Sequence, residues 1–324
     1  MKALRLAALG GPAQLRLDEV DLPRAASDEV VVKVRAAALN HRDVFITKGL
    51  YPGIELPRTL GSDGVGELEG RRVVIDPMIG WGDDPRYWNE NGTILGMPRD
   101  GTFAEYVAVP RANVFDCPPH LSDDEAAAIP LAGLTAFRAV VTRGRVAAGE
   151  TVLLTGIGGG VQTLALLFAK QAGARVIVTS SSDAKLERAR ALGADAGVNY
   201  RTDAQWYKTV RSLAGGHLDV AIDSAGGETL ARALDLMRTG GRVIVYGGTQ
   251  GEAQIRPFSI FWKHLDVLGT SMGSPGDFAA MLKRFRNGLR PVVDRVFALK
   301  DGVAAFERLD QAEQFGKVIL RVSA

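Results

Sequence analysis

The fold is decided by residues 151–170, TVLLTGIGGGVQTLALLFAK, in which a glycine turn separates two apolar runs. The first run is typical of a buried strand and the second of a helix. Glycine lets a turn tighten and lets the backbone approach a ligand with no Cβ in the way. The N–H groups at the start of a helix suit a pyrophosphate. The sequence therefore predicts a dinucleotide-binding turn. Its residues are Gly156, Gly158, Gly159, Gly160 and Val161.

Strands and helices alternate after this turn. The helical stretch 183–193 places Leu186, Ala189 and Leu192 on one face. Strands that are separated by helices pair in parallel, so we predict an α/β fold with a doubly wound, six-stranded Rossmann sheet. The expected strands are 151–155, 175–179, 197–200, 218–222, 242–246 and 266–270.

The rest of the chain predicts a second, β-rich domain. Short apolar strands with glycine and proline between them fill the first part, and residues 80–101 look irregular. Ser122 is placed to cap a helix that begins at Asp123, and Pro130 must break or restart that helix. We expect the tail to return to the first domain. The predicted boundaries are 1–119 with 291–324 for the catalytic domain, and 120–290 for the dinucleotide-binding domain.

Composition excludes several classes of protein. The chain has 324 residues, 46% of them hydrophobic and 23% charged, with a net charge of +2. It shows no basic tract for nucleic acid, and no apolar run approaches the roughly 20 residues of a membrane-spanning helix. The start of the chain turns polar too soon for a secretory signal. The single cysteine, Cys117, excludes an internal disulfide framework. We expect a cytoplasmic enzyme and a passive Cys117 thiol.

Motifs spread over nearly the whole chain resemble the medium-chain dehydrogenase/reductase family. The resemblance implies a GroES-like catalytic domain, interrupted by the Rossmann domain, with the active site between them. The matching segments are Met1-Lys2-Ala3, Asn40-His41-Arg42-Asp43, Leu60-Gly61-Ser62-Asp63-Gly64-Val65-Gly66, 100–106, Leu134-Thr135-Ala136, the glycine turn and Phe315-Gly316-Lys317-Val318.

The zinc ligands of this family decide the branch that the chain resembles. The positions that look equivalent to the ligands of the catalytic zinc are Asn40, Ser62 and Leu131, none of which is a good zinc ligand. Residues 80–101 contain none of the cysteines of the structural zinc lobe. The chain therefore resembles the zinc-free quinone oxidoreductase branch, the zeta-crystallin-like proteins, and no metal is expected. One alternative stays open, in which His41, Asp43 and Asp63 form an unusual metal site outside these positions.

The end of the second Rossmann strand carries serines where enzymes that prefer NAD usually carry a carboxylate. The resemblance sets Ser181, Lys185 and Tyr200 around the 2′-phosphate of NADP, so NADP is the expected cofactor. Two alternatives without a cofactor stay open: the serines form only a loop and a helix cap, and Lys185 is only a solvated helix residue. The resemblance also places Thr135 and Gly247 near the nicotinamide.

Two neighbours of the turn stay open. Asp223 either caps a helix over 228–238 or contacts the cofactor. Gln162 replaces the last glycine of the family turn, and its side chain either points outward or widens the turn.

Without zinc, hydride transfer favours a quinone or an α,β-unsaturated carbonyl, because these small molecules spread the developing charge onto oxygen. We expect Asn40 to orient the carbonyl and Tyr51 to donate a hydrogen bond or a proton; Tyr51 packing over the ring is an equal alternative. His41 relays a proton or is simply exposed. The other functions that stay open are an enoyl-thioester reductase and a non-catalytic, cofactor-binding scaffold. An edge strand at 266–272 predicts a homodimer.

Overall fold

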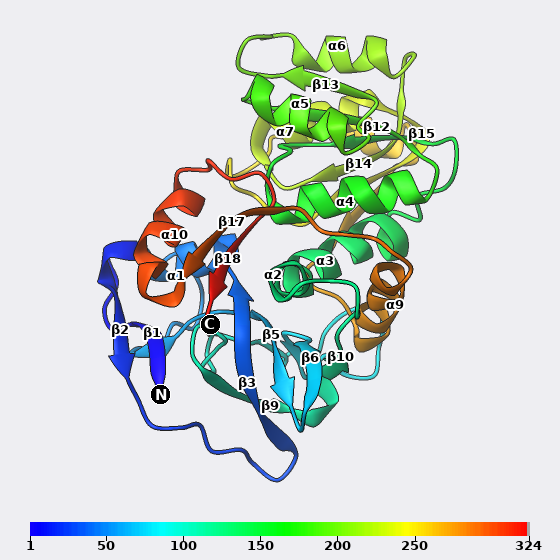
Figure 1. Cartoon of the computed structure of the whole chain (residues 1–324). Coiled ribbons are helices and arrows are strands. Elements are labelled where there is room, and N and C mark those ends of the chain that lie inside the picture. Colours follow the sequence, from blue (N-terminus) through cyan, green and yellow to red (C-terminus); the bar gives the residue numbers. More distant parts are fainter. Residues whose placement is uncertain (323–324) are drawn as a thin grey trace. The chain divides into compact units, whose positions relative to one another are not determined.

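The computed structural model describes residues 1–322, which form two compact units. The first unit contains residues 1–134 and 273–322, and the second contains residues 135–272 (Figure 1). The domain boundaries predicted from the sequence, at residues 119/120 and 290/291, stay a proposal. No helix in the described part of the chain combines the length and the apolar character that crossing a bilayer requires.

The second unit is built on one sheet of six parallel strands. The order is β13-β12-β11-β14-β15-β16, so the chain winds outward in one direction from β11 and in the other from β14. This order is the doubly wound Rossmann arrangement, which confirms the predicted fold class. The strands are β11 (Thr151–Leu154), β12 (Arg175–Ser180), β13 (Ala196–Asn199), β14 (Leu218–Asp223), β15 (Met237–Val245) and β16 (Asp266–Gly269).

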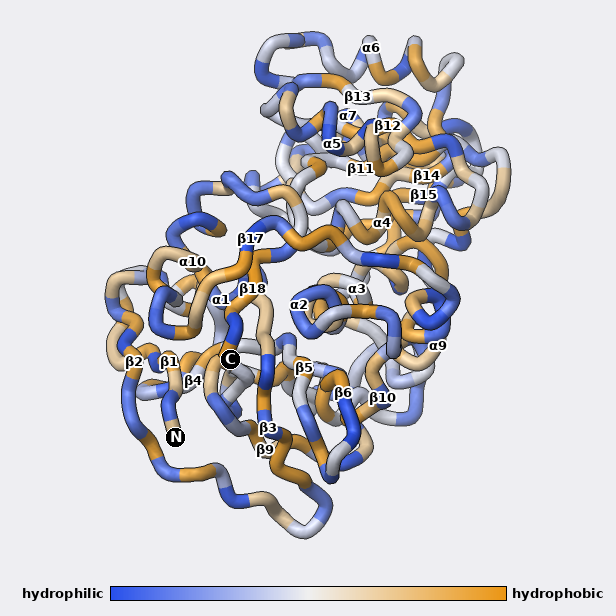
Figure 2. Tube along the Cα trace, in the orientation of Figure 1, coloured by the Kyte–Doolittle hydropathy of each residue, from blue (hydrophilic) through white to orange (hydrophobic). Residues whose placement is uncertain are grey.

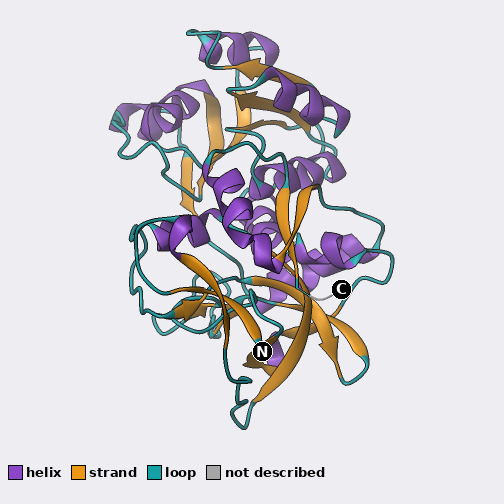
Figure 3. Cartoon of the chain, turned by 60° about the vertical axis from the view of Figure 1, so that its left-hand side comes forward, coloured by secondary structure: helices purple, strands orange, loops and turns teal. Residues whose placement is uncertain are grey.

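Helices cover both faces of this sheet, as Figure 3 shows. Because right-handed crossovers in opposite directions place helices on opposite faces, α4 and α5 share one face while α6, α7 and α8 share the other. The central strand β11 and the middle of β12 and β14 are apolar and buried between these layers. Figure 2 shows the hydrophobic stretches of the chain in orange. The helices are α4 (Gly160–Gln171), α5 (Asp183–Ala191), α6 (Trp206–Leu213), α7 (Gly227–Leu236) and α8 (Pro257–Phe261), with a π-helical turn, η3 (Arg138–Arg143).

The first unit contains the second, β-rich domain that the sequence predicts, and its main sheet has seven strands. The order is β10-β6-β5-β3-β18-β17, and β9 also pairs with β3. Because β18 pairs with β3, the C-terminal tail returns to this unit as expected. The strands of the unit are β1 (Lys2–Leu6), β2 (Leu15–Glu19), β3 (Glu29–Ala38), β4 (Arg58–Thr59), β5 (Asp63–Leu68), β6 (Arg71–Ile75), β7 (Met78–Ile79), β8 (Thr93–Ile94), β9 (Tyr106–Pro110), β10 (Val114–Asp116), β17 (Val293–Ala298) and β18 (Lys317–Arg321).

Helices pack around this sheet and complete a core of aliphatic side chains, in which Phe103 and Phe306 meet edge to face. Ser122 accepts a hydrogen bond from the N–H of Glu125, so it caps the predicted helix, and a new helix starts at Pro130. The helices are α1 (His41–Thr47), α2 (Asp123–Ala127), α3 (Pro130–Phe137), α9 (Pro275–Arg286) and α10 (Gly302–Asp310), with 3-10 turns η1 (Pro12–Gln14), η2 (Arg111–Asn113) and η4 (Leu299–Asp301). The division between the two units falls within α3.

Candidate functional site

Asn40 lies at the start of α1, in a buried polar cluster of the first unit. Its amide oxygen, Oδ1, accepts a hydrogen bond from Lys317 Nζ at 2.6 Å, and its Nδ2 donates to Asp63 Oδ2 at 3.0 Å. A cation on one side and a carboxylate on the other allow only one orientation of the amide. The second hydrogen of Nδ2 is not used by these bonds.

Lys317 holds this cluster together. The side chain is 3% exposed, and its three donors are matched by Leu39 O at 2.7 Å, Asn40 Oδ1 at 2.6 Å and Asp63 Oδ2 at 2.7 Å. The other carboxylate oxygen of Asp63 accepts from the main-chain N–H of Leu131 at 2.7 Å. The buried ion pair is thus fully hydrogen-bonded, which is the condition under which buried charges are tolerated.

Arg42 links the predicted Tyr51 to Ser62. Its Nε donates to the Tyr51 hydroxyl at 3.3 Å, and the guanidinium lies over the tyrosine ring, 4.7 Å from its centroid. Its Nη1 donates to Ser62 Oγ at 2.7 Å and to Leu95 O at 2.9 Å. Because the Tyr51 oxygen accepts from arginine, the phenol proton points elsewhere and stays available as a donor.

Three other groups from the sequence analysis have clear surroundings. His41 is exposed. Asp43 is buried and accepts the N–H of Asn40 at 2.8 Å, and burial raises the pKa of its carboxyl to about 6 in spite of the nearby Arg42 charge. Cys117 is buried, and burial raises the pKa of its thiol to about 11, which favours the unreactive thiol form.

The glycine turn in the second unit has the conformation that the sequence predicts. Gly156 and Gly158 adopt φ of +70° and +137°, a region that favours glycine. Gly159 precedes α4, and no side chain caps its first turn, which also carries no acidic residue. The N–H groups of this turn are therefore suited to an anion such as a pyrophosphate.

Gln162 points inward, so the interpretation with an outward side chain is wrong. The residue is buried, and its Nε2 donates to Thr155 O at 2.9 Å and Ile222 O at 3.1 Å, at the ends of β11 and β14. Its amide nitrogen thus satisfies two main-chain oxygens. Gln162 thereby fastens the start of α4 to the centre of the sheet.

The structure brings the three residues proposed for the 2′-phosphate to one edge of the sheet. The main-chain N–H of Tyr200 donates to Ser180 O at 3.0 Å, so β12 and β13 end side by side next to Ser181. Lys185 lies in the first turn of α5 and reaches back to the glycine turn. A Cβ added to Gly158 would lie 3.2 Å from its ammonium nitrogen. No carboxylate ends β12, and nearby Asp183 accepts a hydrogen bond from Asn199 Nδ2.

Asp223 is the last residue of β14, where the strand order reverses. Its carboxylate accepts from Thr155 Oγ1 at 2.7 Å and from the N–H of Gly226 at 2.8 Å, so it fixes the loop before α7. No described side chain caps the first turn of α7, so the capping bond is not formed, and contact with the cofactor stays a prediction. Burial raises the pKa of this carboxyl. Gly247 approaches the same loop, because a Cβ there would lie 2.7 Å from Ser224 O. Thr135 is buried on α3.

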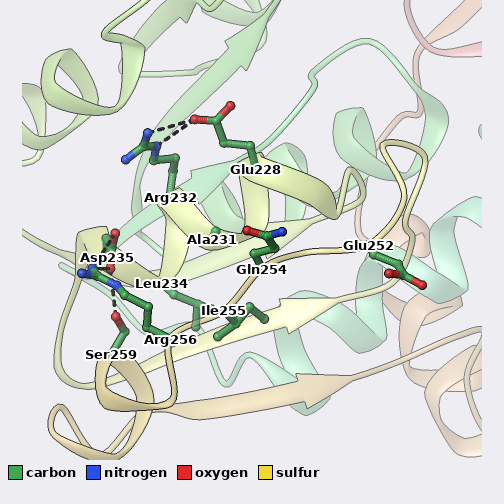
Figure 4. Close-up of a pocket in the computed structure, with 10 residues that line it drawn as sticks. All are labelled: Glu228, Ala231, Arg232, Leu234, Asp235, Glu252, Gln254, Ile255, Arg256 and Ser259. Carbon is green, nitrogen blue, oxygen red and sulfur yellow. Dashed lines mark hydrogen bonds and ion pairs between the residues drawn. The ribbon is translucent and has the colours of Figure 1, made fainter.

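A surface pocket lies elsewhere in the second unit, between α7 and the segment 252–259 (Figure 4). Its charged groups largely pair among themselves. Arg232 bonds to Glu228, and Arg256 and Ser259 bond to Asp235. None of the predicted cofactor residues lines it.

Comparison with known proteins agrees with this geometry. The alcohol dehydrogenase GroES-like domain matches residues 26–119, and the zinc-binding dehydrogenase domain matches residues 160–287. A zinc-type alcohol dehydrogenase-like protein, YogA of Leptosphaeria maculans, is 37% identical over 95% of this chain and 94% of its own. The chain belongs to the medium-chain dehydrogenase/reductase family. It is therefore an oxidoreductase of the medium-chain type that uses a nicotinamide cofactor.

Two solved structures of medium-chain dehydrogenases/reductases show how closely the fold is shared. An NAD-dependent alcohol dehydrogenase is 37% identical, with a TM-score of 0.92 over the full length of both chains. The quinone oxidoreductase of Thermus thermophilus, solved also with NADPH, is 32% identical, with a TM-score of 0.80 over 99% of this chain and all of its own. The family is shared by proteins named for both activities.

Sequence reasoning missed two residues of the candidate site. Arg42 and Lys317 appear in quoted motifs but received no role. Lys317 lies 277 positions from Asn40 along the chain, so no local pattern connects them. The available signal was a lysine at the start of an otherwise apolar strand, Val318-Ile319-Leu320.

Proposed function

We propose that the protein is a zinc-independent, NADPH-dependent reductase of quinones or α,β-unsaturated carbonyls. The observation that carries this proposal is that the side chains at the three positions equivalent to zinc ligands are not available to bind a metal. Asn40 Oδ1 is bound by an ammonium group, Ser62 Oγ is held between Arg42 and Leu95 O, and the Leu131 side chain has no donor atom. Within residues 1–322, no group of three His, Cys, Asp or Glu side chains is arranged to hold a metal.

These residues do not fit zinc, which needs thiolate, imidazole or carboxylate ligands close to tetrahedral geometry. A simple alcohol then has no metal ion to bind its oxygen and lower its pKa. A quinone or an enone carries the developing charge on its own oxygen, and hydrogen-bond donors are enough to stabilise it. The chemistry of the donor set therefore favours reduction of an activated carbonyl compound.

Asn40 and Tyr51 are the proposed donors to the substrate oxygen. The fixed amide of Asn40 has one hydrogen left on Nδ2, and Tyr51 has a free phenol proton because its oxygen accepts from Arg42. Both groups are neutral, so each orients a carbonyl without a charge of its own. Tyr51 is also placed to supply the proton that completes the reduction.

NADPH is the proposed cofactor, and when bound it supplies a hydride from its nicotinamide. The serines that end β12, the ammonium of Lys185 beside the glycine turn and the neighbouring Tyr200 suit a 2′-phosphate, which a carboxylate would repel. The pyrophosphate is assigned to the turn from Gly156 to Val161. Thr135 and Gly247 are assigned to the nicotinamide side.

The experiment is steady-state oxidation of NADPH with a simple 1,4-quinone and with an enone. We expect turnover by the wild-type protein, a decrease in kcat of about 10²-fold for Asn40→Ala and a similar or smaller decrease for Tyr51→Phe. Asn287→Ala, at the exposed end of α9, and Tyr207→Phe, on α6, are matched controls expected to keep kcat. Unchanged turnover in both site variants would show that the substrate binds elsewhere.

A second candidate, alcohol oxidation with NAD, is favoured by the printed names of two similar proteins. In the zinc enzymes of the family this activity depends on a metal ion at the alcohol oxygen. Oxidation of primary and secondary alcohols with NAD, measured with and without added zinc, separates the two functions. We expect no zinc-dependent activity, because the three positions offer no zinc ligands.

We also propose that the protein is a homodimer. Strand β16 forms one edge of the Rossmann sheet, where its outer N–H and C=O groups have no strand to pair with among residues 1–322. Such an edge is a template for a strand of a second copy.

A further inference from the structure

Arg42 has one donor group that the protein does not use. The residue is 9% exposed and lies in the first turn of α1. Its Nε and Nη1 are bound to Tyr51, Ser62 and Leu95 O, but its Nη2 is buried and has no hydrogen-bond partner. A buried guanidinium that keeps an unpaired N–H group costs stability, typically about 1–3 kcal/mol or more for a charged group.

The nearby carboxylates do not supply the missing bond. Asp43 accepts the N–H of Asn40 with one oxygen, and its other oxygen is buried and makes no hydrogen bond to Nη2 or to any other described group. Both oxygens of Asp63 are hydrogen-bonded, to Lys317, Asn40 and Leu131. Within residues 1–322, the Arg42 guanidinium forms no ion pair. Its other nitrogens are fixed by three partners, so Nη2 has a defined direction as well as a permanent charge. This combination suits recognition of an oxygen atom of a ligand.

We infer that Arg42 is a catalytic residue whose Nη2 donates to the carbonyl oxygen of the substrate. This inference rests on the proposed function and deepens it, because it adds a cationic donor to the neutral Asn40 and Tyr51. Bound NADPH would supply a hydride to the β-carbon of an enone; the C=C electron pair would then move toward the carbonyl, and the oxygen would carry the enolate charge. Arg42 would stabilise this oxygen. The α-carbon would take the proton that Tyr51 gives up, solvent would return a proton to Tyr51, and the saturated carbonyl compound and NADP would remain.

A fixed cation matters most where negative charge gathers on one oxygen. The enolate of a simple enone concentrates the charge on one oxygen and one carbon, whereas a reduced quinone spreads it over an aromatic ring. Arg42 should therefore contribute more to the reduction of an enone than to that of a quinone. A residue with a merely structural role would affect both substrates equally.

The test compares Arg42→Met and Arg42→Lys with the wild-type protein, using NADPH with an enone and with a 1,4-quinone. We expect kcat for the enone to fall by about 10²-fold in Arg42→Met and by a smaller factor in Arg42→Lys. In Arg42→Met, the factor by which kcat falls should be at least about fivefold smaller for the quinone than for the enone. The KM for NADPH should not change. Arg35→Met, which removes an arginine paired with Glu67 at the surface, is the matched control and should keep kcat. Circular dichroism checks that each variant is folded. If Arg42→Met does not fold, Arg42→Lys, which keeps the positive charge, provides the comparison between the two substrates.

A further arm adds guanidinium chloride at low millimolar concentration to Arg42→Ala. We expect at least a fivefold recovery of kcat with the enone and no change in Arg35→Met. Equal losses for both substrates, or kcat within twofold of wild type in a folded Arg42 variant, would overturn this inference while the proposed function stands. Absence of turnover by the wild-type protein with either substrate would overturn both.

Discussion

At the scale of single residues, one ammonium group organises the candidate substrate site. Lys317 occupies the space between Asn40 and Asp63 and uses all three of its donors there. It compensates the Asp63 carboxylate and fixes the amide of Asn40 in one orientation. The proposed orientation of the substrate carbonyl therefore depends on a residue that does not need to touch the substrate.

Replacing Lys317 tests this arrangement. Lys317→Met leaves Asp63 buried without its cation, and we expect a loss of about 3–5 kcal/mol in the free energy of unfolding, measured by urea denaturation. The double variant Lys317→Met/Asp63→Asn removes both charges and should recover at least about 1 kcal/mol. Lys48→Met, which breaks an exposed pair with Asp310, is the control and should cost less than about 1 kcal/mol. A double variant less stable than Lys317→Met would contradict the assignment.

A second residue predicts how stability depends on pH. Asp76 is buried, and burial raises the pKa of its carboxyl to about 8, although the N–H of Met78 donates to it. The folded protein therefore holds this proton more tightly than the unfolded chain. The stability that Asp76 contributes is present at low pH and is lost as the pH rises toward 8.

Asp76→Asn removes this titration while keeping an oxygen for Met78. The free energy of unfolding is measured by urea denaturation of both proteins at several pH values. We expect the value for Asp76→Asn minus that for wild type to increase by at least about 1 kcal/mol from pH 5 to pH 9. Asp21→Asn, at an exposed position, should show no such trend. Parallel pH profiles for wild type and Asp76→Asn would rule out a raised pKa at this position.

At the scale of elements, the turns that end β11 and β12 define the candidate cofactor site. The glycine turn leaves the first N–H groups of α4 uncapped, and Lys185 on α5 reaches back to it. Gln162 joins the start of α4 to β11 and β14. Two loops and two helix starts thus form one edge whose N–H groups and ammonium are suited to a phosphate.

Cofactor choice tests the proposed role of Lys185. We expect Lys185→Ala to raise the KM for NADPH at least tenfold while the KM for NADH changes less than twofold, because only NADPH carries the 2′-phosphate. Lys208→Ala, an exposed lysine on α6, is the control. Equal changes for the two cofactors would assign Lys185 to the shared pyrophosphate instead.

The elements themselves were largely predictable from the sequence. Apolar runs such as 151–154 and 218–222 have strand length and lie between turn residues, so their period and punctuation were enough. The candidate site was less predictable from the sequence. Gln162 was ambiguous because a sequence does not show which way a side chain points, and Lys317 was missed because its partners are distant along the chain.

At the scale of the whole molecule, the open edge of the Rossmann sheet is the feature that a single chain leaves incomplete. Among the described strands, β16 pairs with β15 only, and Val267 on it is partly exposed. We expect a dimer at micromolar concentration by light scattering, and a shift toward monomer in Val267→Lys, because a lysine on an edge strand opposes strand pairing. Thr202→Lys, after the opposite edge strand, should leave the mass unchanged. A wild-type monomer would exclude this mode of assembly.

Whether a metal takes part in the reaction depends on side chains that come from distant parts of the chain. The positions equivalent to zinc ligands belong to segments far apart in the sequence, and in the folded chain the two with polar side chains, Asn40 and Ser62, are bonded to cationic side chains. The most direct test is NADPH-dependent quinone reduction before and after exhaustive treatment with a zinc chelator, with the metal content of each sample measured. We expect kcat to stay within twofold and the metal content to stay far below one atom per chain. Loss of activity on chelation that one equivalent of zinc restores would contradict the account.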